Sequence, residues 1–253
     1  MSDQLSEAQH RIAQLEKENR ELRDRCSELE ELTRKDPHTG LPMRREFDAI
    51  MEREITRLSI SAGSTSIAVC VLRLDKNYAR IKNSRDRNRV FLFKATQRIR
   101  EAVGPHVYQS DRVDEFICIL HGVTGKAAAK RRAREIYDSV SRPHDPPADD
   151  VLFGCHIGLA VFPGTAQSKA ELFAAADVAL DEAESRSEPC ILYTQSLGRR
   201  HREKVYLEKE IARSIRDGFH HFGIQYQPLV GRDYKILGAE ALARYHHPKL
   251  GEI

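Results

Sequence analysis

Hydrophobic and polar positions change their spacing along the chain. Over residues 1 to about 34, apolar side chains recur at intervals of three and four, the heptad spacing of a coiled-coil helix. From residue 66 onward, short continuous apolar runs alternate with stretches of helical period, which is typical of buried strands joined by helices. Beyond residue 222, the runs GIQYQPLV and ILGAEALARY resemble the opening strands of another domain.

The N-terminal segment predicts a parallel coiled coil. Asn19 lies at a core position, where two facing Asn side chains hydrogen-bond only in a parallel, two-stranded register. In that register three flanking pairs have opposite charges: Arg11 with Glu16, Glu18 with Arg23, and Arg25 with Glu30. A single solvated helix, the alternative, gives no reason for this match. We therefore expect homodimerisation through Ile12, Leu15, Asn19, Leu22 and Leu29.

The middle of the chain predicts an α+β fold, a palm-like mixed sheet flanked by helices. Pro37, Gly40 and Pro42 end the first helix, and a new helix is predicted from Arg44. The order strand, helix, strand hairpin, helix, strand implies one mixed sheet with helices packed on it. Predicted strands are 66–74, 106–109, 115–121, 151–162 and 190–194, and predicted helices are 86–103, 125–140 and 168–186.

Four segments follow from these elements. We expect a coiled-coil helix over 1–34, the α+β domain over 35–196, a charged linker helix and its continuation over 197–221, and the first strands of a further domain over 222–253.

Composition narrows the class of protein. The mean hydropathy is −0.55, no apolar run reaches the roughly 18 residues of a membrane span, and the charged N-terminus lacks a secretory signal, so we expect a cytoplasmic protein without a membrane partner. The 5 cysteines are widely spaced and form no C-x-x-C pair, which favours reduced, buried thiols over disulfides or a zinc site.

Charge is nearly balanced overall but not locally. The net charge of +3 gives no reason to expect a nucleic-acid partner. Between Asp75 and Arg100, however, nine lysines and arginines face two aspartates. This stretch predicts either a docking face for an acidic partner or anionic ligand, or a merely solvated helix face.

Five ordered motifs resemble one family. DPHTGLPMRREF, LRLDKNYARIKN, RVDEF, HIGLAVFP and AADVALDEA are similar in order and spacing to the motifs of the GGDEF (diguanylate cyclase) family over residues 36 to about 194. The family patterns read roughly DPLTGLPNRRxF, DIDxFKxIND, GGDEF, SIGxA and ADxALYxAK. The resemblance implies a nucleotidyl cyclase fold, with Mg²⁺ held by the first Asp of D-x-D and the acidic third residue of GGDEF.

The metal ligands that the resemblance implies are only half retained. Asp114, Glu115 and Phe116 match the end of the GGDEF motif, but Arg73 occupies the position of the first Asp of D-x-D. Exchanging a negative for a positive charge about 4 Å from a divalent ion changes each Coulomb energy by several kcal/mol. We therefore expect no catalytic residues and no cofactor in this chain, and Asp114 as the remnant of a metal site.

Other family positions have changed as well. Arg112 and Val113 replace the two glycines, so the hairpin is expected to keep its strands with another turn type and to block the nucleotide. The guanine-reading positions fall on Lys82 and Arg89, which lack an acceptor. Further replacements are Asp181 for the motif tyrosine, Glu184 for the motif lysine, and Val103 and His106 in the inhibitory R-x-x-D site.

Plainer interpretations stay open for single residues. Asp111 and Asp114 are also explained as solvated residues of a hairpin tip, and Asp75 as a strand-end cap. His156, in an apolar strand where the family has Ser, is interpreted as a satisfied core histidine rather than a metal ligand.

The C-terminal residues are similar to the start of an EAL domain, the cyclic di-GMP phosphodiesterase family. Glu240 matches the metal-binding glutamate of the name motif, Arg244 the phosphate-contacting arginine, and Gln227-Pro228 the first strand. A TIM-type barrel takes roughly 250 residues, so we expect an incomplete domain without hydrolase activity in this chain. Mg²⁺ and cyclic di-GMP are expected only with a complete EAL domain, and strands 222–245 are expected to be disordered or held by another surface.

Three functions remain in competition. The first is a regulatory dimerisation module of a cyclic di-GMP signalling protein, whose inactive GGDEF domain controls an EAL domain that hydrolyses or senses cyclic di-GMP. The second is residual GTP binding or cyclisation by a shifted site using Asp75, Asp114 and Glu115. The third is docking of an acidic partner protein on the basic helix.

Overall fold

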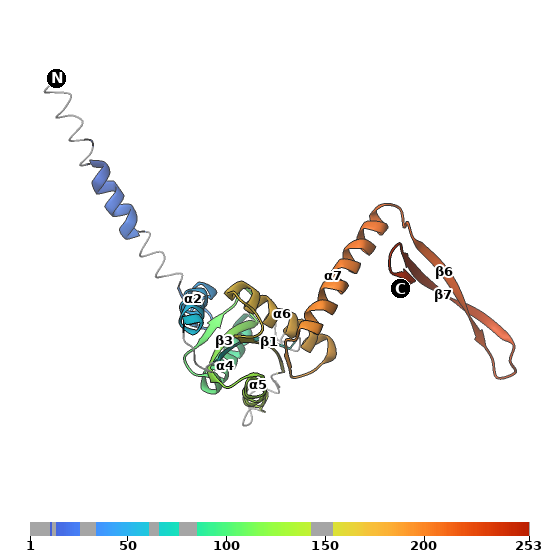
Figure 1. Cartoon of the computed structure of the whole chain (residues 1–253), viewed down its shortest axis with the longest axis horizontal. Helices are drawn as coiled ribbons and strands as arrows, with labels where there is room; N and C mark the ends of the chain where they lie inside the picture. Colours follow the sequence, from blue (N-terminus) through green and yellow to red (C-terminus); the bar gives the residue numbers. More distant parts are fainter. Residues whose placement is uncertain are drawn as a thin grey trace, which may run out of the picture. The chain divides into compact units, whose positions relative to one another are not determined.

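The structure is a computed structural model that describes residues 11, 14–25, 34–60, 66–75, 85–142 and 154–252 (Figure 1). The chain divides into two compact units, Met1–Gln195 and Ser196–Ile253, and each is described by itself. None of the helices within the described ranges is both long and apolar enough to cross a membrane.

The first unit contains a five-stranded mixed sheet with the strand order β2-β3-β1-β4-β5. All neighbouring strands are antiparallel except β4 and β5, which are parallel. The predicted α+β fold with one mixed sheet flanked by helices is thereby confirmed. The strands are β1 (Ser66–Leu74), β2 (Val107–Gln109), β3 (Glu115–Val123), β4 (Cys155–Phe162) and β5 (Cys190–Leu192).

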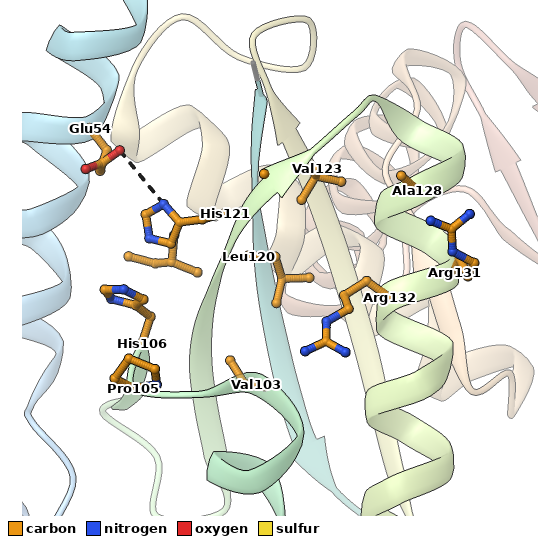
Figure 2. Close-up of a pocket in the computed structure, with 12 residues that line it drawn as sticks. Glu54, Val103, Pro105, His106, Leu120, His121, Val123, Ala128, Arg131 and Arg132 are labelled. Carbon is orange, nitrogen blue, oxygen red and sulfur yellow. Dashed lines mark ion pairs between the residues drawn. The ribbon is translucent and has the colours of Figure 1, made fainter. Parts of the chain in front are cut away.

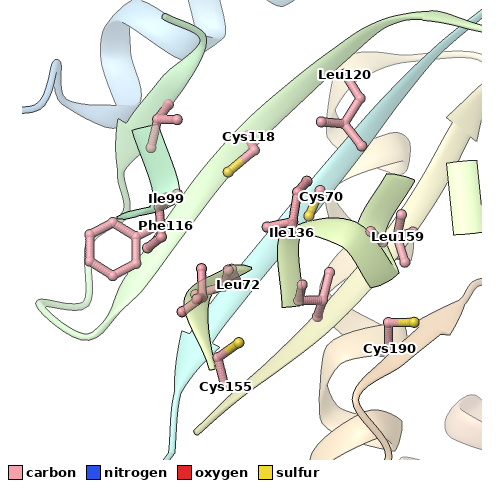
Figure 3. Packing of buried hydrophobic residues seen from close by; sticks show 14 of the residues in the cluster. Cys70, Leu72, Ile99, Phe116, Cys118, Leu120, Ile136, Cys155, Leu159 and Cys190 are labelled. Carbon is pink, nitrogen blue, oxygen red and sulfur yellow. The ribbon is translucent and has the colours of Figure 1, made fainter. Parts of the chain in front are cut away.

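Two helices cover each face of this sheet. Strand β1 is buried along its whole length, because its side chains alternate between two apolar clusters. Cys70 and Leu72 pack with residues of α4 (Arg85–Val103) and α5 (Lys126–Val140), as Figure 3 shows for Ile136 of α5. Val69 and Val71 pack on the opposite face with α2 (Arg44–Ile60) and α6 (Lys169–Arg186).

Helix α6 lies very close to the sheet because β4 has a glycine beneath it. A Cβ atom at Gly158 would come within 2.1 Å of the backbone oxygen of Ala176. Only a residue without a side chain permits this approach. Gly158 therefore fixes how closely the side chains of α6 reach the end of β1.

The cysteines behave as predicted where they are described. Cys70, Cys118, Cys155 and Cys190 are buried free thiols, and burial is the main cause of the raised pKa of Cys155, to about 12. Cys26 lies outside the described residues.

The N-terminal helix is described only in part. Residues 14–25 are helical, and Leu15 and Leu22 are 47% and 62% exposed. Ile12 and Leu29 of the predicted dimer interface lie outside the described residues, while Asn19 is an exposed helical residue. The coiled-coil dimer stays a prediction.

The second unit is made of α7 from Ser196 onward and a strand hairpin. Helix α7 spans Gln195–Arg216, and the strands are β6 (Phe222–Val230), β7 (Ile236–His247) and β8 (Gly251–Glu252). Of the two alternatives expected for 222–245, disorder or strands held by another surface, the structure describes paired strands: β6 and β7 are antiparallel over most of their length. Their side chains are largely exposed, and an isolated two-stranded hairpin is only marginally stable in water, which favours a further surface that holds it.

The β6–β7 hairpin has one polar and one apolar face. Gln225 and Gln227 lie on the same face as Glu240 and Arg244, and Arg244 Nε donates to Gln225 Oε1 at 2.9 Å. The opposite face pairs Ile224 with Ala243, Tyr226 with Ala241 and Pro228 with Ala239.

Candidate functional site

Arg73 is a charged residue at the end of an otherwise apolar strand. Because side chains alternate along β1, Arg73 lies on the same face as Val69 and Val71, which is the face covered by α6. The strand register places Glu115 of β3 on one side of Arg73 and His156 of β4 on the other. Arg73 is only 9% exposed, so its charge requires partners within the protein.

Four carboxylates surround the Arg73 guanidinium. Its Nε and Nη2 donate to Glu115 Oε2 at 3.0 and 2.8 Å, while Nη1 donates to Glu184 Oε2 at 2.9 Å and to Asp181 Oδ1 at 3.3 Å. Asp177 Oδ1 lies 3.7 Å from Nη2. We call this group the Arg73 cluster, and its members are Arg73, Glu115, Asp177, Asp181 and Glu184.

Helix α6 presents its three carboxylates to Arg73 as one row. Asp177, Asp181 and Glu184 are spaced by four and three residues, which places them on one side of a helix. The Ser168 side chain caps α6 by accepting from the Glu171 N–H, and Gly158 permits the close approach of the helix to β4. Local sequence signals thus fix the start of the helix and its distance from the sheet.

Glu115 uses both carboxylate oxygens within the protein. Oε2 accepts two bonds from Arg73, and Oε1 accepts the Ser110 hydroxyl at 2.6 Å. Glu115 is 4% exposed, so these bonds replace the water that the carboxylate loses on burial. The arrangement is that of a satisfied buried ion pair rather than of a carboxylate directed toward a ligand.

The ionisation of the cluster follows from its geometry. Burial alone would lower the pKa of Arg73, but the hydrogen bonds and charges of Glu115 and Glu184 hold that pKa above its ordinary value. The pKa of Asp177 is raised, first by burial and then by the negative charges of Asp181 and Glu115. Burial and the two neighbouring carboxylates thus outweigh the opposing charges of Arg73 and Arg44, so the ionised form of Asp177 is disfavoured.

The hairpin between β2 and β3 keeps its strands without glycines. Its turn is closed by the Glu115 N–H bonding to the Arg112 carbonyl at 3.2 Å, and the positive backbone φ angles of the described residues all lie elsewhere. The predicted change of turn type is confirmed. Val113 at the tip is 43% exposed.

The two aspartates of this turn have partners besides water. Asp114 pairs with Arg112, with Oδ1 3.3 Å from Nε, and Asp111 pairs with Arg44 of α2 at 3.1 Å. The interpretation of both as residues of a hairpin tip stays open, and each also has an arginine partner in the structure. Asp114 is not a member of the Arg73 cluster, although its carbonyl accepts the Leu74 N–H at 2.9 Å.

The remaining predicted site residues are spread over the first unit. Phe116 is fully buried in the core, Arg89 is exposed on α4, and Lys82 lies outside the described residues. His156 is half-buried rather than a core residue, and its Nδ1 lies 2.8 Å from the Glu188 carbonyl. Asp75 follows β1 and donates its N–H to the Gly154 carbonyl.

No metal-binding constellation occurs in the part of the chain that the structure describes: no group of three or more His, Cys, Asp or Glu side chains is arranged to hold an ion. The hairpin of the second unit gives Glu240 only Gln227 as its cross-strand neighbour. A single carboxylate with an amide neighbour does not make a metal centre.

The sequence did not reveal the partners of Arg73. The motif AADVALDEA contains Asp177, but the sequence predicts no contact for this residue. Asp181 and Glu184 are recognised from the sequence only as departures from the family pattern. The signal was present, because Arg replaces Asp at position 73 while Glu replaces Lys at position 184, so both charges are reversed together.

Comparison with known proteins identifies this fold and family. The structure is similar to the GGDEF domain of YfiN (TpbB) from Pseudomonas aeruginosa, with a TM-score of 0.58, 24% identity, and coverage of 66% of this chain and 99% of that one. The family described as diguanylate cyclase, GGDEF domain, matches residues 33–189. The chain therefore belongs to the GGDEF family.

Two further matches extend beyond this domain. An uncharacterized protein, y4lL, of Sinorhizobium fredii is 30% identical over 240 residues, which is 89% of this chain but 27% of that protein. The chain thus spans about a quarter of the length of this curated relative. The S helix-GGDEF-EAL structure of Vibrio cholerae LapD matches with a TM-score of 0.53 at 16% identity, covering 92% of this chain and 54% of that one.

Proposed function

We propose that this chain is a regulatory and dimerisation module of a cyclic di-GMP signalling protein, whose GGDEF domain is catalytically inactive and controls an EAL domain. The observation that carries the proposal is the Arg73 cluster, in which an arginine takes the place of a metal-binding aspartate and is bound by Glu115, Asp181 and Glu184.

The argument against a metal at this place is electrostatic. A divalent ion about 4 Å from the Arg73 guanidinium would meet a repulsion of about 8 kcal/mol at an effective dielectric constant of 20. The nearest buried carboxylate, Glu115, already has a partner for each oxygen. A metal would have to break these bonds and displace the arginine before it gained a ligand.

The double reversal of charge favours a maintained structural role over simple decay of the site. Relative to the family pattern, position 73 has changed from acidic to basic and position 184 from basic to acidic, and Arg73 Nη1 donates to Glu184 Oε2 at 2.9 Å. Either change alone would leave two like charges close together. Together they place an ion pair between positions 73 and 184 while removing the metal ligand that the resemblance implies.

The segments before and after the GGDEF domain in the sequence support the dimerisation and EAL parts of the proposal. The N-terminal helix exposes Leu15 and Leu22 with heptad spacing, which supports a parallel homodimer. Strands β6 and β7 carry Gln227 opposite Glu240 in the EAL-like motif, and the LapD structure that matches most of this chain contains an EAL domain and is bound to c-di-GMP. We infer the start of an EAL domain, which would bind Mg²⁺ and cyclic di-GMP when complete.

The test is a calorimetric titration of GTP with Mg²⁺ into the full chain and three variants. We expect no saturable binding by the wild type at high micromolar GTP. Arg73→Asp and Glu184→Lys, combined with Arg112→Gly and Val113→Gly, restore the family's charges and open the turn, and this variant is expected to gain measurable, Mg²⁺-dependent affinity. Asp111→Ala, which removes an exposed turn carboxylate, is the control and should match the wild type. Wild-type binding that disappears in Asp114→Ala would overturn the proposal in favour of a GTP-binding domain.

A second candidate function is docking of an acidic partner on α4. Val90 and Phe93 are 50% and 51% exposed on this helix, and exposed Arg89 lies beside Val90 in the sequence. Exposed apolar side chains next to a cation favour binding of an amphipathic segment that carries both apolar and acidic side chains. Binding of such a partner should weaken steeply with salt and be lost in Arg89→Glu, whereas Arg134→Glu on α5 should retain it.

A further inference from the structure

A second group of titratable residues lies at the other end of the sheet, away from the Arg73 cluster. A pocket of about 510 Å³ is bounded by α2, by the end of β3 and by α5 (Figure 2). Strand β2 pairs only with Phe116–Cys118 of β3, so β3 has no β2 partner along its last residues. Two histidines, His106 before β2 and His121 on β3, fill the side of the pocket that faces α2.

The two imidazoles are in contact with each other and with one carboxylate. Their ring centroids are 4.5 Å apart, at an angle of 58°. Figure 2 marks the contact of His121 with Glu54 of α2, in which Nδ1 lies 3.9 Å from Oε2 and which is an ion pair only when His121 is protonated. The same Oε2 accepts from Arg57 at 2.6 Å. Glu54 therefore already forms an ion pair with Arg57, and its single charge cannot also neutralise two imidazolium ions.

We propose that the His106–His121 pair is a proton-sensitive contact between α2 and the edge of the sheet, closed at neutral pH and opened when both rings are protonated. With both rings neutral, Glu54 and Arg57 balance each other, and the rings pack as uncharged aromatic groups. One proton is accommodated by Glu54. A second places two cations in contact, and the repulsion then acts between His106 and His121 at the sheet edge and between these rings and Arg57 of α2.

The other charged groups around the pocket act in the same direction. Arg131 and Arg132 of α5 line its far side, and Glu135 is the carboxylate that pairs with both. His106 has only the Tyr108 hydroxyl, at 3.5 Å, as a close polar neighbour of its Nδ1. Glu54 is the one carboxylate among the pocket residues, so no other carboxylate there can neutralise the doubly protonated pair.

The direction of the titration agrees with this geometry. Burial, and then the charge of His106, lower the pKa of His121, while Glu54 acts in the opposite sense. A histidine whose pKa is lowered on folding contributes stability that is complete above its unfolded pKa of about 6.5 and is lost as the pH falls through the folded value. Acidification therefore weakens this contact. The inference is independent of the proposed function, since it involves no residue of the Arg73 cluster.

The test follows the histidine ring signals of the full chain by NMR as a function of pH. His121 is expected to titrate below about 6.5, the ordinary value. His106→Gln should raise the His121 pKa toward that value by removing the second cation, and Glu54→Gln should lower it further. His38→Gln, which removes an exposed imidazole on the chain segment before α2, is the matched control and should change nothing. An ordinary His121 pKa that is unaffected by His106→Gln would overturn the proposal.

Amide hydrogen exchange supplies the conformational measurement. After correction for intrinsic rates, amides of α2 near Glu54 should exchange faster at pH 5 than at pH 7.5 in the wild type and in His38→Gln. His121→Gln cannot take the second proton, so its exchange should not depend on pH in this way. Equal acceleration in His121→Gln would show that another group opens the contact, and would also overturn the proposal.

Discussion

Arg73 and Glu115 face each other across β1 and β3, with Nη2 2.8 Å from Oε2. The pair is buried on both sides, since Arg73 is 9% and Glu115 4% exposed. Its contribution is thus to be judged as that of a buried ion pair, in which the loss of one partner costs far more than the pair itself contributes.

Removal of the Arg73 charge is expected to destabilise the first unit strongly. Arg73→Ala leaves the buried Glu115 with Ser110 and the more distant Arg112, at 3.9 Å, as side-chain partners, and we expect a loss of about 3–5 kcal/mol in the free energy of unfolding. Urea denaturation monitored by circular dichroism measures it. Arg112→Ala removes an exposed arginine whose contact with Glu115, at 3.9 Å, is longer than that of Arg73, and should cost less than about 1 kcal/mol. Equal losses in the two variants would contradict the assignment of Arg73 as the centre of the cluster.

Gly158 is expected to tolerate no side chain. A Cβ at this position would overlap the backbone of α6 at Ala176 and Leu180, so Gly158→Ala must displace the helix. We expect a loss of about 1–3 kcal/mol in urea denaturation. Gly164→Ala is a control for the general cost of replacing glycine, because its Cβ position is open although its backbone φ is positive. A milder effect at 158 than at 164 would refute the close contact of α6.

The ionised Asp177 side chain is expected to lower the free energy of unfolding at neutral pH. Because its pKa is raised on folding, its contribution is most favourable below the unfolded pKa of about 3.9 and is lost as the pH rises through the folded value. Asp177→Asn should therefore be more stable than the wild type at pH 7, by a few tenths of a kcal/mol since the side chain is 44% exposed, and similar to it at pH 3.5. Denaturation at both pH values decides this, and a variant less stable at pH 7 would show that attraction to Arg73 dominates.

The N-terminal helix is expected to pair two chains. Replacing Leu15 and Leu22 by Asn removes two exposed apolar residues of heptad spacing and should shift the protein from dimer to monomer in light scattering at tens of micromolar. Lys17→Gln, on the outside of the helix, should leave the dimer intact. A wild type that is monomeric at this concentration would end the dimer hypothesis.

The sequence alone determined the layout of the first unit. Each strand and helix of the sheet was predicted within a few residues, since burial on both faces requires continuous apolar runs such as SIAVCVLRL, and Gly and Pro mark the ends. The sequence also indicated, through the order of the family motifs, that Arg73 stands where the family pattern has an aspartate.

Only the tertiary structure decided what Arg73 does. Its partners come from β3 and α6, 42 to 111 residues away in the chain, and nothing local specifies that a strand end and a helix row meet there. The same holds for His106 and His121, which strand pairing brings together although the sequence showed His106 only as a departure from the family's R-x-x-D site and gave His121 no role. Side-chain period predicts the face of an element on which a residue lies, but the residues it meets depend on how the faces are packed.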